Sequence, residues 1–138
     1  MVYEEIVISV LGVVGTASII TACLTYVFDK RKKIAFRMQR FKEMRYKAMI
    51  LHMKVLLKPD DLKYMQIRRP DLRNMEDVKN EVETELFNCL LFASDDVIKS
   101  LKEFIQTPNN VSYVKTAFAM RKDCWNIKTS LKAEEINL

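Results

Sequence analysis

The sequence is poor in the residues that most often make turns. It has two glycines and three prolines in 138 residues, and both glycines, Gly12 and Gly15, lie inside one hydrophobic segment. Sheet-rich proteins need many tight turns, which Gly and Pro commonly supply. Their scarcity favours an all-α chain. The lack of any glycine after Gly15 also excludes a Gly-rich phosphate-binding loop.

Histidine and cysteine are too few for the usual catalytic or metal sites. His52 is the single histidine, and the three cysteines, Cys23, Cys89 and Cys124, form no C-x-x-C pair. A disulfide framework needs paired cysteines, and a zinc site needs about four clustered ligands. We therefore expect free thiols in a reducing cytoplasm, a structural role for His52, and no bound metal or cofactor.

The carboxylates offer no better start for an enzyme. Glu81, Glu83 and Glu85 are close in sequence, but on a helix only the first and third share a face. No E-x-x-H motif accompanies them, as a di-iron helical bundle would require. We expect solvated charges here, and we expect that the protein is not an enzyme.

The strongest positive signal is a long apolar run at the N-terminal end. Ile6–Phe28 holds 23 residues without a charged side chain, and a helix of that length spans the ~30 Å hydrocarbon core of a bilayer. Glu4 and Glu5 precede it, and Asp29–Lys33 is rich in Lys and Arg. We therefore expect residues 1–28 to comprise an N-terminus outside and the transmembrane helix Ile6–Phe28, and the positive-inside rule predicts residues 29–138 in the cytoplasm. We expect the N-terminus to remain uncleaved. A cleavable signal peptide would instead need a basic start and a shorter apolar core.

Small side chains recur on one face of this run. Ser9, Gly12 and Thr16 follow each other at steps of three and four residues, a spacing that permits close approach of a second transmembrane helix. Small residues are also common in membrane spans that pack against nothing. The pattern makes Ser9, Gly12 and Thr16 a candidate transmembrane packing face.

Positive charge is concentrated directly after the apolar run. Asp29–Lys58 carries eleven Lys or Arg against two acids, so its net charge is +9, whereas the net charge of the whole chain is +5. Anionic lipid headgroups are the nearest partner for such a segment. An acidic protein is a second possibility, and a nucleic acid a third, less favoured one. The candidate basic face consists of Lys30, Arg31, Lys33, Arg37, Arg40 and Lys47.

Apolar periodicity predicts four further helical segments that form one antiparallel bundle. The first continues from the membrane to Pro59, with an expected buried stripe of Ile34, Met38, Phe41, Met44, Ala48, Leu51 and Val55. Asn74 is the expected N-cap of the second helix, and Ser94 that of the third. The fourth follows the break at 107–110. Helices with single apolar stripes bury them against each other.

Two segments of the bundle have a wider resemblance. Leu90–Ile98 reads LLFASDDVI, and Ala119–Asp123 reads AMRKD. They resemble the "ASDEVI" and "MRKDL" segments of uncharacterised prokaryotic single-pass membrane proteins with a helical domain, although Cys124-Trp125 stands where Leu-Gly is expected. The resemblance implies the same architecture and no particular chemistry.

The acidic and basic residues of these two segments predict a clasp between the third and fourth helices. Its expected members are Ser94, Asp95, Asp96, Arg121 and Asp123. With no convergent polar site in view, we expect a non-catalytic, membrane-anchored accessory subunit of a larger complex. A homo-oligomeric scaffold or sensor on anionic lipid and a membrane-tethered nucleic-acid binder are the alternatives.

Overall fold

The structure is a computed structural model, which describes the backbone of residues 2–136 and the side chains of residues 18–136. The described chain is helical and contains no strand, so the predicted all-α class is confirmed. It divides into two units, Met1–Met38 and Gln39–Leu138. The second is called the bundle unit below.

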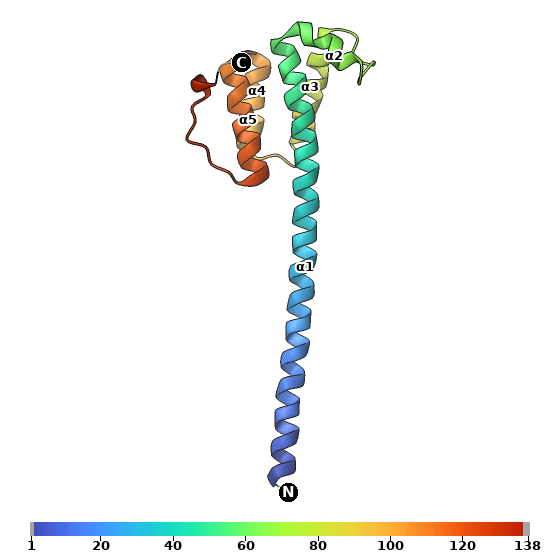
Figure 1. Cartoon of the computed structure of the whole chain (residues 1–138), viewed down its shortest axis with the longest axis vertical. Helices are drawn as coiled ribbons and strands as arrows, with labels where there is room; N and C mark the ends of the chain where they lie inside the picture. Colours follow the sequence, from blue (N-terminus) through green and yellow to red (C-terminus); the bar gives the residue numbers. More distant parts are fainter. Residues whose placement is uncertain (1, 137–138) are drawn as a thin grey trace. The chain divides into compact units, whose positions relative to one another are not determined.

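One helix runs through most of the N-terminal half, and shorter ones follow it (Figure 1). The elements in chain order are α1 (Val2–Leu57), the 3-10 turn η1 (Pro59–Asp61), α2 (Leu62–Gln66), α3 (Met75–Cys89), α4 (Asp95–Gln106), α5 (Asn110–Trp125) and the 3-10 turn η2 (Ala133–Glu135).

The ends of these helices have local causes. α1 ends at Leu57 because Lys58 precedes a proline, which disfavours helical backbone there. The Asn74 side chain accepts a hydrogen bond from the backbone N–H of Asp77 at 2.9 Å, as expected of an N-cap. Ser94 occupies the N-cap position of α4, yet its side chain makes no capping bond. α5 ends where Asn126 takes a left-handed conformation, φ 52°, ψ 28°.

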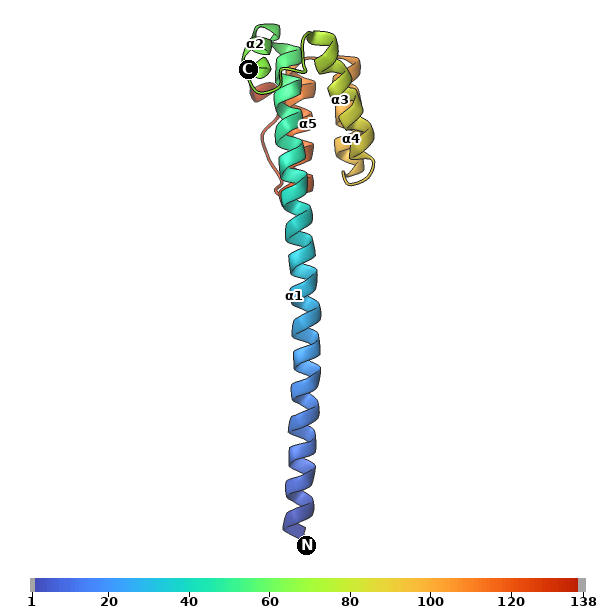
Figure 2. The ribbon, with the colours of Figure 1, turned by 90° about the vertical axis from the view of Figure 1, so that its right-hand side faces the viewer.

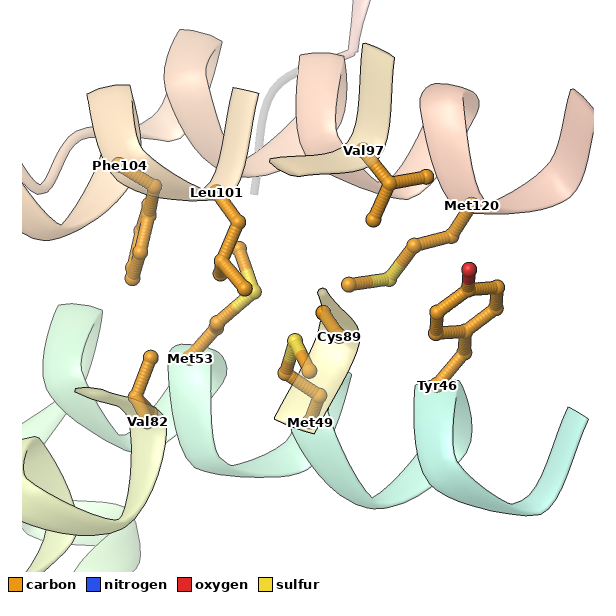
Figure 3. Close-up of a cluster of buried hydrophobic side chains, with 9 residues drawn as sticks. All are labelled: Tyr46, Met49, Met53, Val82, Cys89, Val97, Leu101, Phe104 and Met120. Carbon is orange, nitrogen blue, oxygen red and sulfur yellow. The ribbon is translucent and has the colours of Figure 1, made fainter. Parts of the chain in front are cut away.

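Within the bundle unit, α3, α4 and α5 lie beside the C-terminal part of α1, and successive long helices run in opposite directions (Figure 2). The main core receives side chains from all four helices (Figure 3). Its buried members are Tyr46, Met49, Met53, Val82, Cys89, Val97, Leu101, Phe104 and Met120. A smaller cluster of Val55, Leu72 and Val78 lies under α2 and the connector that follows it.

The expected buried stripe of α1 is wrong for most of its length. Ile34, Met44 and Leu51 are exposed by more than half, and of the expected stripe only Val55 is buried. The core instead uses Tyr46, Met49 and Met53, which lie on the opposite side of the helix. α1 is thus apolar on two sides, and sequence periodicity alone does not say which side the bundle covers.

The predicted transmembrane helix, Ile6–Phe28, lies partly outside the described side chains. Among the residues that the structure describes, no helix combines the length and the apolar character needed to cross a membrane. Residues 6–17 of the predicted span Ile6–Phe28 have side chains outside the described set, and the candidate packing face of Ser9, Gly12 and Thr16 lies there.

Candidate interaction surface

The exposed side of α1 in the bundle unit borders two cavities. The larger, about 620 Å³, lies between α1 and the α2 region, and its wall includes Ala48, Val55 and Met65. The smaller, about 470 Å³, lies between α1 and α5, with Ile50 and Trp125 in its wall. Leu51, which is 53% exposed, lines both. The two hollows therefore adjoin on the helix face that points away from the core.

We call the combined hollow the α1 groove. Along α1 the groove extends from Glu43 to Val55, which at 1.5 Å per residue is about 18 Å or three helical turns. Most of its surface is apolar, and cationic side chains stand around it. The charged residues of its walls are Glu43, Lys47, Lys54, Asp61, Arg68, Arg69 and Arg121.

Several of these charges are already paired within the bundle unit. Lys47 Nζ lies 2.5 Å from Glu43 Oε1, and Lys54 Nζ lies 3.1 Å from Asp61 Oδ2. Arg69 bridges Asp71 at 2.7 Å and Glu81 at 3.2 Å. These pairs hold the long side chains along the rim. The walls keep an excess of positive charge, because no ion pair is described for Arg68 or Arg121 in residues 18–136.

His52 lies in the wall of the larger cavity and is 5% exposed. Burial lowers its pKa below the ordinary value, so the neutral imidazole is favoured near neutral pH. Its Nδ1 is buried without a hydrogen-bond partner among the described residues. No Ser, Cys or carboxylate is hydrogen-bonded to it in that part of the chain, so no nucleophile and base pair is built around it.

Other basic residues of α1 form ion pairs with neighbouring helices. Lys42 Nζ lies 2.8 Å from Asp123 Oδ2 on α5, and the Tyr46 hydroxyl donates to the same carboxylate. Burial and the neighbouring Asp123 both raise the pKa of Tyr46. Arg45 Nη2 lies 2.8 Å from Glu85 Oε1 on α3. Part of the basic segment therefore fastens α1 to its neighbours.

The candidate basic face is split between the two units. Lys30, Arg31, Lys33 and Arg37 are exposed in the first unit, and Arg40 and Lys47 are exposed in the second. Of this set, Lys47 lines the α1 groove.

Of the residues of the expected clasp, Asp96 forms an ion pair between α4 and α5, and its partner is Lys122 and not Arg121. Lys122 Nζ lies 2.8 Å from Asp96 Oδ2, which joins the two helices. Asp123 turns to α1 instead, and Arg121 lines the groove. No ion pair is described for Asp95 in residues 18–136. Ser94 begins α4 without a side-chain cap.

The described residues hold no group of His, Cys, Asp and Glu suited to a metal ion. Cys89 is buried, which raises the pKa of its thiol to about 11 and keeps it protonated. Cys124 is half-buried, and its thiol faces the carbonyl oxygen of Gln39 at 3.6 Å. Both cysteines behave as small apolar side chains with weak polarity.

The sequence prediction missed the groove as a site. The available signal was the second apolar stripe of α1, Tyr46, Met49 and Met53, which repeats at steps of three and four residues. Comparison with protein families, with curated proteins and with solved structures gave no match for this chain.

Proposed function

We propose that the protein is a membrane-anchored, non-catalytic interaction subunit that packs against a larger membrane complex. Ile6–Phe28 is its single anchor, with the N-terminus outside and residues 29–138 in the cytoplasm. The acids before and the bases after this run support that orientation.

The observation that carries the proposal is the apolar outer side of α1 in the bundle unit. Met44 is 66% exposed and Leu51 is 53% exposed, although the opposite side of the same helix fills the core. A helix that is apolar on two sides is typical of a central helix with neighbours on both. Val55 on the outer side is covered by the cluster under α2, but from Met44 to Leu51 the bundle covers only the inner side, and a partner protein would cover the other.

The basic residues nearest the anchor support a second, lipid contact. Lys30, Arg31 and Lys33 are exposed, and each such cation contributes about 1 kcal/mol at an anionic membrane surface. This contact positions the subunit at the membrane and leaves the apolar side of α1 for protein.

The test is purification of the full chain from native membranes in a mild detergent, followed by mass measurement and identification of what accompanies it. We expect a complex that contains a different membrane protein. A complex made only of copies of this chain, or a monomer under the mildest extraction, would contradict the accessory role.

Orientation is tested separately with a tag at the C-terminal end and protease added to intact cells. We expect the tag to survive until the cells are opened. Digestion in intact cells would place the bundle outside.

A further inference from the structure

The α1 groove has the form of a receptor for one helix. Its floor is α1, α5 forms one wall, and α2 with the connector after it forms the other. The apolar positions Met44, Ala48 and Leu51 are exposed and follow each other at steps of four and three residues on the outer side of α1. Ala48 and Leu51 line the groove. Three turns of an amphipathic helix match this length, and such helices dock through residues at i, i+3, i+4 and i+7.

The charges of the walls specify the chemistry of that helix. Of the five cations that line the two cavities, Lys47, Lys54 and Arg69 are already in ion pairs. No ion pair is described for Arg68 or Arg121 in residues 18–136. Arg121 stands at the α5 side, and Arg68 at the α2 side. A helix with an apolar stripe and acidic flanks would place carboxylates against both walls. Complementary charge of this kind sets partner choice between helices.

A second copy of this chain does not meet the same requirement. Its own exposed stripe of Met44, Ala48 and Leu51 is flanked by Lys47 and Lys54, which are also exposed. Two copies anchored in the same membrane face each other in parallel. A second copy would place these lysines, and no carboxylates, against Arg68 and Arg121.

We infer that the α1 groove binds an acidic amphipathic helix of another protein, with Leu51 as the central apolar contact. The inference rests on the proposed function, because it names the surface through which the interaction subunit meets its partner. It adds the class of ligand, a helix with an apolar stripe between glutamate- or aspartate-rich flanks.

The fluorescence of Trp125 can report binding in the groove. Trp125 is the single tryptophan of the chain, it lines the smaller cavity, and it is 50% exposed. The full chain is placed in discs of neutral phosphatidylcholine and titrated with a tryptophan-free helical peptide. The peptide has leucines at the a and d positions and glutamates on its flanks. A matched peptide carries lysines in place of the glutamates.

We expect the acidic peptide to shift the Trp125 emission to shorter wavelength at saturation, and the lysine peptide to bind at least roughly tenfold more weakly. Leu51→Asp should weaken the acidic peptide by at least roughly tenfold. Leu91→Asp, on the 86% exposed residue of the α3–α4 turn, should leave binding unchanged. Circular dichroism checks that both variants stay folded.

Charge reversal gives a variant that does not depend on the apolar contact. Arg121 is exposed, so Arg121→Glu should fold normally, weaken the acidic peptide and strengthen the lysine peptide. Equal binding of the two peptides to the wild type, or no response to either, would overturn the inference.

Two controls address other occupants of the groove. A shift that appears on raising the protein concentration without peptide, and that Leu51→Asp removes, would identify a second copy. A shift with vesicles that contain phosphatidylserine, equally sensitive to Leu51→Asp, would identify the membrane. Either result overturns the inference. If the natural complex survives Leu51→Asp and the peptides do not bind, the proposed function stands and the groove assignment is wrong. If no other protein co-purifies with the wild type, the proposed function itself is wrong.

Discussion

Asp123 joins α5 to α1 through two hydrogen bonds. Its carboxylate accepts from Lys42 Nζ and from the Tyr46 hydroxyl, and its side chain is 10% exposed. Asp123→Ala leaves a half-buried ammonium and a buried phenol without their acceptor. We expect a loss of about 3 kcal/mol in the free energy of unfolding, measured by urea denaturation of the full chain in detergent. Asp95→Ala is the matched control, and an equal loss there would show that the Asp123 contacts contribute little.

His52 should make the stability of the bundle depend on pH. Burial lowers its pKa in the folded state, so the unfolded chain takes up its proton first as the pH falls. The stabilising contribution is complete above the unfolded pKa of about 6.5 and is lost as the pH falls through the lower folded pKa. We expect His52→Gln to reduce the difference in unfolding free energy between about pH 7.5 and pH 5. An unchanged difference would mean that carboxylates account for the whole effect.

At the scale of the elements, the N-cap residues Asn74 and Asn109 make a side-chain capping hydrogen bond, and the N-cap residue Ser94 does not. Asn109 accepts from the backbone N–H of Ser112 at 2.8 Å, and the Ser112 hydroxyl accepts in return from the backbone N–H of Asn109. Asn109→Ala removes this reciprocal bond and should cost about 1 kcal/mol. Ser94→Ala should cost clearly less, because Ser94 makes no capping bond. Thermal unfolding of the two variants checks the order, and equal losses would contradict it.

How far the elements follow from the sequence depends on how local their causes are. Pro59, Asn74 and the break at 107–110 act on their immediate neighbours, and the helix ends that they predict are confirmed. Val82 of α3 and Leu101 and Phe104 of α4 stand on apolar stripes at helical spacing, and all three are buried. The buried side of α1 was not predicted correctly, because Met44 and Met49 are equally apolar and only the packing of α3, α4 and α5 distinguishes them. The groove depends on the same choice: two apolar stripes on α1 indicate that one of them is left outside the core, but they do not indicate which one.

The whole molecule combines two candidate contacts with a partner, one in the membrane and one in the bundle unit. The Gly12→Leu, Thr16→Leu double substitution adds bulk to the predicted transmembrane face, where close approach needs small side chains. We expect the variant to insert normally and to lose its co-purifying partner, since overpacking costs about 1–3 kcal/mol. Val13→Leu with Val14→Leu is the matched control, with bulk placed beside that face.

Retention of the partner by the Gly12 and Thr16 variant would reduce Ile6–Phe28 to a tether. The interaction would then depend on the bundle unit alone, and Leu51→Asp in the same background should abolish it. Loss of the partner in the valine control as well would show sensitivity to bulk in general and would contradict a specific face.

The methionines of the bundle unit differ in how readily an oxidant can reach them. Met49 and Met53 are fully buried, and Met120 is 3% exposed (Figure 3), whereas Met44 is 66% exposed on the outer side of α1. Peroxide converts an accessible methionine to its polar sulfoxide, and a reductase can reverse the change. Met44 is therefore oxidised while the fold stays intact, and the core methionines react only when the bundle opens. Mild oxidative stress would thus make the outer apolar stripe polar before it damages the fold, and the proposed partner contact should weaken first.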